Sequence, residues 1–313
     1  MQKATPLILV LILAVTAGIF SVRSHKPPVL PPVVETVPEP AAPAPLPTVK
    51  TDTAAPKVTP RPWPQASSDI APDPGATFGT LENGMRYIIY PNAEPPKRVS
   101  LRLHIAAGSL MEADDQQGLA HFLEHMVFNG SKNYTAAELI PRMQRLGISF
   151  GAHANAYTSF DETVYMLDLP DLSEDTLKLG FTVMRDFGDG ALLSPEEIDK
   201  ERGVILSEKM SRDSVNTRLM EQQFAELLPD SLVSRRFPIG TEEVIKSAPR
   251  ERFLDLYTRY YTPERMTFIV VGDIDPKEIQ SKIEKTFASM SNPAIPGQNP
   301  VLGPIKQPEG LDT

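Results

Sequence analysis

From about residue 77 onward, the chain alternates between short segments with a hydrophobic period of two and longer segments with a helical period. Val99–Ala106 is the clearest strand, because its apolar residues alternate with polar ones such as Arg102 and His104. Asn83-Gly84 follows Thr80-Leu81 and is a typical hairpin turn. The other predicted strands are Met85–Tyr90, Phe150–Thr158, Thr163–Leu169 and Thr267–Val271.

The longest predicted helix follows Ser194. This serine is a natural N-cap, and Pro195 fits the first helical position. The pattern predicts that the helix runs unbroken to about Leu228-Pro229. The other predicted helices are Leu119–Asn129, Ala136–Leu146, Ser173–Phe187, Glu251–Tyr260 and Pro276–Ala288. This order of elements predicts an α+β layer arrangement rather than regular βαβ alternation.

The N-terminal end carries an apolar run, Leu7–Phe20, within an uncharged stretch that follows Lys3. A run this short is typical of a signal peptide rather than of a full membrane span. We therefore expect residues 1–24 to export the protein to the periplasm or another extracytoplasmic compartment. The small residues of Val15-Thr16-Ala17 lie inside the apolar run, so an uncleaved membrane anchor is the alternative.

Residues 25–75 are rich in proline, with pairs such as Pro27-Pro28 and Pro31-Pro32. Closely spaced prolines strongly disfavour helices and central strands, so we expect a disordered linker here. We assign residues 76–290 to one folded domain. Residues 291–313 contain Pro and Gly and are expected to form a second linker.

Composition narrows the possible functions. The chain has 313 residues, 41% of them hydrophobic and 23% charged, as in a soluble globular protein. Its net charge of −9 argues against nucleic acid as a partner, because phosphates need a basic surface. The absence of cysteine excludes disulfides, thiolate metal sites and cysteine nucleophiles.

Two histidines, His121 and His125, lie four residues apart in a predicted helix. Residues with this spacing project from one helix face, so both imidazoles can reach one metal ion. Glu124 flanks the same face, where it could accept a proton from a metal-bound water. This His-x-x-Glu-His order is the inverted zincin motif.

The same three side chains could instead lie on a solvated helix face. However, the neighbouring residues are largely apolar: Phe122, Leu123, Met126, Val127 and Phe128. Burying two histidines and a glutamate among apolar side chains is costly unless a partner pairs with them. A metal ion is the simplest such partner.

A third ligand must come from another segment, and the helix after Ser194 offers Glu201 and Glu208. They are seven residues apart and share a face with Val204 and Ile205. One carboxylate could bind the metal while the other hydrogen-bonds a ligand histidine. Two exposed helix glutamates are the alternative interpretation.

The inverted motif together with the Glu-Arg-x-Val-x-x-x-Glu segment at residues 201–208 resembles the pitrilysin/insulinase (M16) metallopeptidases. Other matching segments follow in order: Leu81-x-Asn83-Gly84-Met85-Arg86, Ala107-Gly108-Ser109, Phe128-Asn129-Gly130-Ser131, Asn155-Ala156-Tyr157-Thr158, Pro238-Ile239-Gly240-Thr241 and Val270-Val271-Gly272-Asp273. The similarity covers about residues 77–290.

The resemblance implies one Zn²⁺ per chain, bound by His121, His125 and Glu208. It makes Glu124 the general base that activates water and Glu201 a residue that supports the ligands. The interval between His125 and Glu208 is slightly longer than the family usually shows. Glu201 is therefore the alternative third ligand.

The resemblance also implies a two-layer fold, in which helices cover a mostly antiparallel mixed sheet. Asn155 and Ala156 would lie on an edge strand that pairs with the peptide substrate. An ordinary strand end with a turn-forming asparagine is the alternative. The implied activity is that of a zinc endopeptidase acting on extended peptides or small unfolded proteins.

Members of this family are built from repeated halves, and the second half contributes an arginine and a tyrosine that hold the substrate. We therefore expect this chain to be the N-terminal catalytic half, either a fragment or a subunit that acts with a second M16-type domain or chain. A catalytically silent binding subunit is the alternative function. The set of His121, Glu124, His125 and Glu208 argues against that alternative.

Overall fold

A six-stranded mixed sheet organises the computed structural model, which describes residues 62–305. The strand order is β1-β2-β6-β3-β5-β4, and only the β2–β6 pair is parallel. The strands are β1 (Thr77–Thr80), β2 (Arg86–Pro91), β3 (Val99–Ile105), β4 (Ala154–Thr158), β5 (Thr163–Leu169) and β6 (Met266–Gly272). The predicted leader at residues 1–24 lies outside the described residues.

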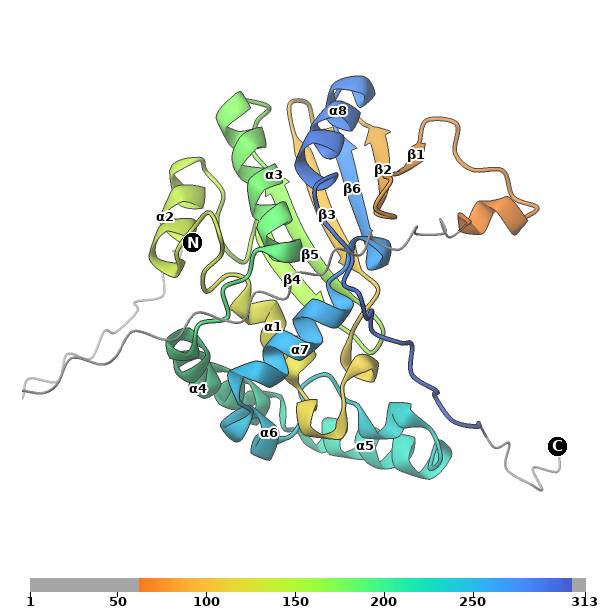
Figure 1. Cartoon of the computed structure of the whole chain (residues 1–313), viewed down its shortest axis with the longest axis vertical. Helices are drawn as coiled ribbons and strands as arrows, with labels where there is room; N and C mark the ends of the chain where they lie inside the picture. The colour runs from red at the N-terminus through yellow and green to blue at the C-terminus, as the bar shows by residue number, and fades with distance from the viewer. Residues whose placement is uncertain (1–61, 306–313) are drawn as a thin grey trace, which may run out of the picture. The chain divides into compact units, whose positions relative to one another are not determined.

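Helices form the second layer and one end of the domain. They are α1 (Leu119–Met126), α2 (Ala136–Arg145), α3 (Glu174–Asp189), α4 (Pro195–Arg212), α5 (Val215–Leu227), α6 (Glu242–Ser247), α7 (Arg250–Tyr260) and α8 (Pro276–Phe287). Short 3-10 helices are η1 (Pro64–Ser67), η2 (Ser109–Met111), η3 (Asp114–Gln116), η4 (Leu232–Arg235) and η5 (Pro263–Arg265). Figure 1 shows α3 and α8 on one face of the sheet, with α1, α4, α5, α6 and α7 beyond the strand ends. The prediction of a two-layer α+β fold is confirmed.

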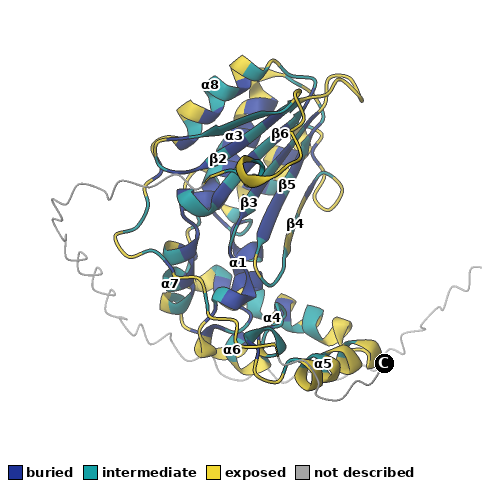
Figure 2. Cartoon of the chain, turned by 90° about the vertical axis from the view of Figure 1, so that its right-hand side faces the viewer, coloured by how far each residue is buried: buried dark blue, intermediate teal, exposed yellow. Residues whose placement is uncertain are grey.

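The core lies between the sheet and the pair α3 and α8. Burial alternates along β3 and β6, as expected for strands with one face against a core. Phe268 of β6 packs against Phe181 of α3 and Phe287 of α8, with ring centroids 5.4 and 4.8 Å apart. The buried positions of the strands are dark blue in Figure 2.

The prediction of one long helix after Ser194 is wrong. The chain leaves the helical conformation at Asp213, with φ −70° and ψ 106°. The Ser214 side chain then accepts a hydrogen bond from the amide of Thr217 at 3.1 Å and caps a new helix, α5. Serine hydroxyls compete for backbone amides in this way, so a serine inside a helical pattern can begin a second helix.

The strand predicted from Phe150 begins only at Ala154. Gly151 has a φ of +84°, and the amide of His153 donates to the carbonyl of Ser149 at 2.8 Å. These features form a turn instead of ladder pairing, because a left-handed residue cannot continue a strand. Among residues 62–305, no helix is both long and apolar enough to cross a bilayer.

Candidate metal centre

Helix α1 carries the two histidines and is held by an unusual N-terminus. Gly118 precedes it with a φ of +101°, a conformation that favours glycine. A Cβ on Gly118 would lie 2.9 Å from the Cα of Gly240, so the two backbones approach closely. Both observations explain why glycine stands directly before the helix.

A buried carboxylate completes this N-terminus. The Glu112 side chain accepts hydrogen bonds from the amides of Gly118 and Ala120, at 3.0 and 2.8 Å. These amides have no partner within the helix, and a negative charge is favoured at this end. Burial nevertheless raises the pKa of Glu112 to about 8, although the two amides and Arg236 favour its ionised form.

Helix α4 brings the second part of the site. The guanidinium of Arg202 donates to the carbonyls of Ile245 and Ala248, at 2.6 and 2.7 Å. These bonds fasten α4 to α6, while α4 also packs against α1. Residues 201 and 208, two turns apart on α4, therefore face the histidines of α1.

Two histidine nitrogens and one carboxylate converge between these helices. Oε2 of Glu208 lies 3.6 Å from Nε2 of His121 and 3.5 Å from Nε2 of His125. Ligand atoms of the three residues all lie within 4.8 Å of one another. Among residues 62–305, this is the only group of three or more such side chains with this geometry.

This donor set fits Zn²⁺. Ligands about 2.0–2.1 Å from a tetrahedral zinc are about 3.3–3.4 Å apart, which is close to the separations from Glu208 to the two imidazoles. Burial, followed by the neighbouring His125 and Arg212, lowers the pKa of His121 to about 3. His121 is therefore neutral near pH 7, as a metal ligand must be.

Glu201 occupies a different position from Glu208. Its Oε1 lies 2.9 Å from Nδ1 of His125, the ring nitrogen that faces away from Glu208. Its Oε2 accepts a hydrogen bond from Nδ2 of the Asn129 side chain at 2.7 Å. These contacts hold the pKa of Glu201 below its usual value, since the His125 bond outweighs partial burial. In this geometry Glu208 faces the Nε2 atoms of both histidines, whereas Glu201 contacts Nδ1 of His125 alone.

Glu124 lies on the same helix, next to His125, and is only 9% exposed. Its Oε2 accepts a hydrogen bond of 2.6 Å from the hydroxyl of Thr158, at the end of β4. Burial raises the pKa of Glu124, while the Thr158 bond and the nearby His125 oppose that rise. A carboxylate with a raised pKa can accept and hold a proton.

A cavity of about 460 Å³ contains these groups. Asn155 and Ala156 line it from β4, and Arg212 lines it from the end of α4. Arg212 also forms an ion pair with Oε1 of Glu208, while Oε2 of the same carboxylate faces the histidines. The cavity walls otherwise include apolar side chains: Phe128, Phe150, Tyr157 and Val204.

The structure thus brings together all seven residues that the sequence singled out: Glu124, Glu201, His121, His125, Glu208, Asn155 and Ala156. Sequence reasoning assigned no role to Asn129, Thr158 or Arg212. The sequence could have indicated two of them. Asn129 and Arg212 each lie four residues after a predicted ligand, so helical spacing places them on the same face as that ligand.

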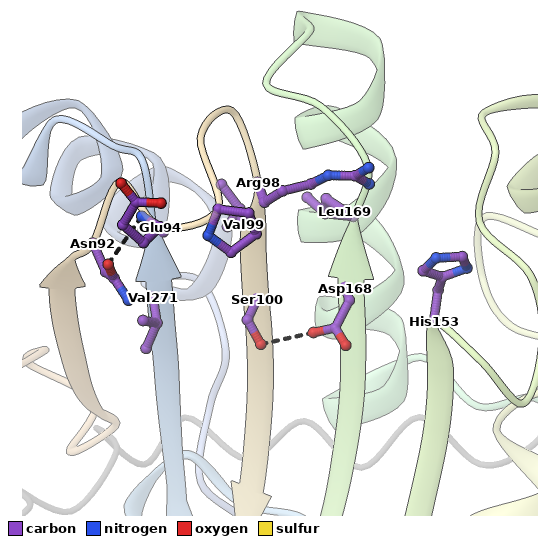
Figure 3. A pocket seen from close by; sticks show the side chains of 11 residues that line it. Asn92, Glu94, Arg98, Val99, Ser100, His153, Asp168, Leu169 and Val271 are labelled. Atoms are coloured by element: carbon purple, nitrogen blue, oxygen red, sulfur yellow. Dashed lines mark hydrogen bonds between the residues drawn. The ribbon is translucent and has the colours of Figure 1, made fainter.

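A second cavity, of about 490 Å³, lies at the opposite end of the sheet. Figure 3 shows the Ser100 hydroxyl bonded to Asp168, at 2.7 Å, and His153 at the start of β4. Nδ1 of His153 accepts from the amide of Ser149, at 3.1 Å, so this histidine does not join the metal centre. His104 pairs with Glu162 on the sheet, at 3.1 Å.

Comparison with known proteins identifies the family of the chain. The family model for insulinase (peptidase family M16) matches residues 87–233, and the peptidase M16 inactive domain matches residues 247–311. The probable zinc protease PqqL of Haemophilus influenzae is 39% identical over 221 residues. This match covers 71% of our chain and 24% of PqqL.

Solved structures show the same relationship. The periplasmic protease PqqL from Escherichia coli has a TM-score of 0.72 and 36% identity, over 76% of this chain and 26% of its own. The first half of that protein has also been crystallised by itself. Its TM-score and identity to this chain are the same, and the match covers 51% of that first half. The chain thus spans about a quarter of the PqqL proteins and about half of the crystallised first half of the Escherichia coli protein. By sequence and by structure, the chain belongs to the insulinase family of peptidases, M16.

Proposed function

We propose that this chain is the zinc-binding part of an endopeptidase that hydrolyses extended peptides or small unfolded proteins. One observation carries the proposal. The carboxylate of Glu124 lines the same cavity as His121, His125 and Glu208, beside the strand that ends the sheet. A base, a set of metal ligands and a peptide-binding edge therefore meet in one place.

Zinc, when bound, supplies a Lewis acid that polarises a carbonyl and lets water lose a proton near neutral pH. Glu124 would accept the proton from the attacking water and deliver it to the leaving amine. The raised pKa of Glu124 suits both steps, because the carboxyl group must hold the proton between them. His121, His125 and Glu208 would hold the metal, and Glu201 would orient His125.

The substrate would lie along β4. Among the strands of the described residues, β4 pairs only with β5. On its other edge Ala154 bridges to Phe150, and the Ala156 amide donates to Oδ1 of Asn155 at 2.9 Å, so a peptide would bind beside residues 156–158 and take the place of that side chain. Main-chain hydrogen bonds to Asn155 and Ala156 would add the peptide as a further strand, about 4.7–4.9 Å away. Such bonds bind extended chains with little dependence on sequence.

The complete protease would include a second M16-type domain or subunit. The chain spans only about a quarter of the PqqL proteins, and the inactive-domain match at residues 247–311 points toward that further part. We assign residues 76–290 to the zinc-binding domain and residues 291–313 to the connection. The other part would supply groups that stabilise transition-state charge on the carbonyl oxygen.

We also propose that the protein acts outside the cytoplasm. The similar PqqL of Escherichia coli is described as a periplasmic protease. The apolar run at Leu7–Phe20 has the length of a signal peptide. Retention of this segment as a membrane anchor is the alternative, which N-terminal sequencing of the mature protein would resolve.

The test combines metal analysis with peptide cleavage. We would measure bound zinc and hydrolysis of an unstructured peptide for wild type, Glu124→Gln and Glu196→Gln, with and without the remaining part of the protein. Glu196 is an exposed glutamate on α4 and serves as the matched control. We expect about one zinc in each protein, and turnover that Glu124→Gln lowers by about 10²–10⁴-fold.

Each outcome distinguishes the candidate functions. Zinc binding without turnover in the complete protein would favour the silent binding subunit. A wild-type protein that binds no zinc in chelator-free buffer would overturn the metallopeptidase assignment. Equal loss in Glu196→Gln would show that the effect of Glu124→Gln is not specific.

A further inference from the structure

The hydrogen bond between Thr158 and Glu124 joins the edge strand to the base. The Thr158 hydroxyl donates to Oε2 of Glu124 over 2.6 Å, within the range typical of the strong O–H···O bonds that carboxylates accept. Oε2 is thereby occupied, and Oε1 is the carboxylate oxygen that remains for another partner. Both residues line the cavity of the metal centre.

The position of Thr158 follows from strand geometry. Alternate residues of β4 point to opposite sides, so Thr158 shares a side with Ala156 and Ala154. Ala154 is buried, Ala156 packs against the core, and β4 packs against α1. Of these three residues, only Thr158 carries a hydrogen-bond donor on its side chain.

We propose that Thr158 is a positioning residue for Glu124, which it holds in the orientation needed to accept a proton from the attacking water. The inference rests on the proposed peptidase function and adds a residue to it. Thr158 acts through Glu124 and has no assigned contact with metal or substrate.

Two physical arguments support this role. A glutamate side chain has several rotatable bonds, and one strong hydrogen bond removes much of that freedom. A general base is also effective only within hydrogen-bond reach of its proton, so a small misplacement has a large kinetic effect.

The strand connection adds a consequence for binding. Thr158 lies two residues beyond Ala156, on the strand that we propose for the peptide. The same backbone would then set the position of the scissile bond and the orientation of the base. The distance between the scissile bond and the base would then depend only on the backbone of β4 and on the hydrogen bond from Thr158 to Glu124.

The kinetic test compares wild type, Thr158→Val, Thr158→Ser, Glu124→Gln and the Thr158→Val/Glu124→Gln double variant in the complete, zinc-loaded protein. Valine has nearly the shape of threonine and suits a strand, but it lacks the hydroxyl. We expect Thr158→Val to lower kcat about 10–100-fold, while KM and zinc affinity stay within about twofold. Serine should restore most of kcat, and Thr158→Val should add no loss to Glu124→Gln.

Several results would overturn the positioning role. They are an unchanged kcat in Thr158→Val, an equal loss in Thr158→Ser, or a further loss when Thr158→Val is added to Glu124→Gln. A fall in zinc affinity that matches the fall in kcat would instead place the defect in the metal site. Circular dichroism of each variant would show whether it is folded.

Crystal structures of wild type, Thr158→Val and Thr158→Ser separate this inference from the proposed function. If no peptide is cleaved by the wild type, the peptidase proposal fails, but the orientation of Glu124 can still be compared. A carboxylate that turns away in Thr158→Val and stays in Thr158→Ser supports the role of Thr158. A carboxylate with the same orientation in both variants overturns it.

Discussion

Oε1 of Glu201 lies 2.9 Å from Nδ1 of His125, on the side of the ring opposite to Glu208. The imidazole is thus held between two carboxylates of one helix. A hydrogen bond at Nδ1 fixes which nitrogen carries the proton, and leaves the Nε2 lone pair for a metal. On this contact we propose that Glu201 orients His125 and does not bind the metal.

Glu201→Ala is expected to weaken zinc binding by about 10–100-fold without removing it. The ring of His125 would lose its orienting partner, and Asn129 would lose its acceptor. Competition with a chelator of known affinity measures the change. Glu196→Ala is the matched control, and an equal loss in that variant would contradict the assignment.

Replacing Glu208 should have a larger effect. Glu208→Gln removes the carboxylate that faces both Nε2 atoms, so only two strong donors remain. We expect its zinc affinity to fall below that of Glu201→Ala in the same competition assay. The reverse order would make Glu201 the third ligand, which is the alternative left open by the sequence.

Glu112 predicts a pH effect on stability. Its pKa is about 8 in the folded protein and about 4.3 for a free side chain, so the folded state binds more protons between these values. This contribution to stability is present below about pH 4.3 and is lost as the pH rises toward 8, by at most about 1.4 kcal/mol per unit.

Glu112→Gln should remove that dependence. Urea unfolding of the metal-free protein from pH 5 to 8, compared between wild type and variant, isolates the contribution of this group. A difference between the two proteins that stays constant with pH would show that Glu112 has an ordinary pKa.

Two glycines give a prediction about the backbone. Gly118→Ala places a Cβ 2.9 Å from the Cα of Gly240 in a left-handed conformation, so we expect a loss of about 1–3 kcal/mol in unfolding free energy. Gly203→Ala is the control, because it meets nothing within 4 Å in the middle of α4. That substitution should stabilise the protein by about 0.4–1 kcal/mol. Thermal and chemical unfolding measure both, and equal effects would contradict the argument.

The fold was largely predictable because most elements have a strong period. The alternation in Val99–Ala106 identified β3, and the Ser194-Pro195 start identified α4. The break at Asp213 was not predictable from hydrophobic period, because no residue of α5 is buried and its pattern carries little information. Gly151 similarly delayed the start of the strand predicted from Phe150, because its local conformation forms a turn.

The candidate site was also only partly predictable from the sequence. Helical spacing placed His121 and His125 on one face, because that geometry is local. The choice between Glu201 and Glu208 depends on how α4 packs against α1, which spacing does not define. The bond from Thr158 to Glu124 joins residues far apart in the chain, so it needed the tertiary structure.

The division of the ligands between α1 and α4 has a thermodynamic consequence. An ion bound by His121, His125 and Glu208 would cross-link two helices that are far apart in the sequence, and only the folded chain brings these ligands together. A ligand that binds only the folded state at 100 times its Kd adds about 2.7 kcal/mol to stability. The melting temperature would then report the free zinc concentration, and a chelator would act on this protein as a mild denaturant.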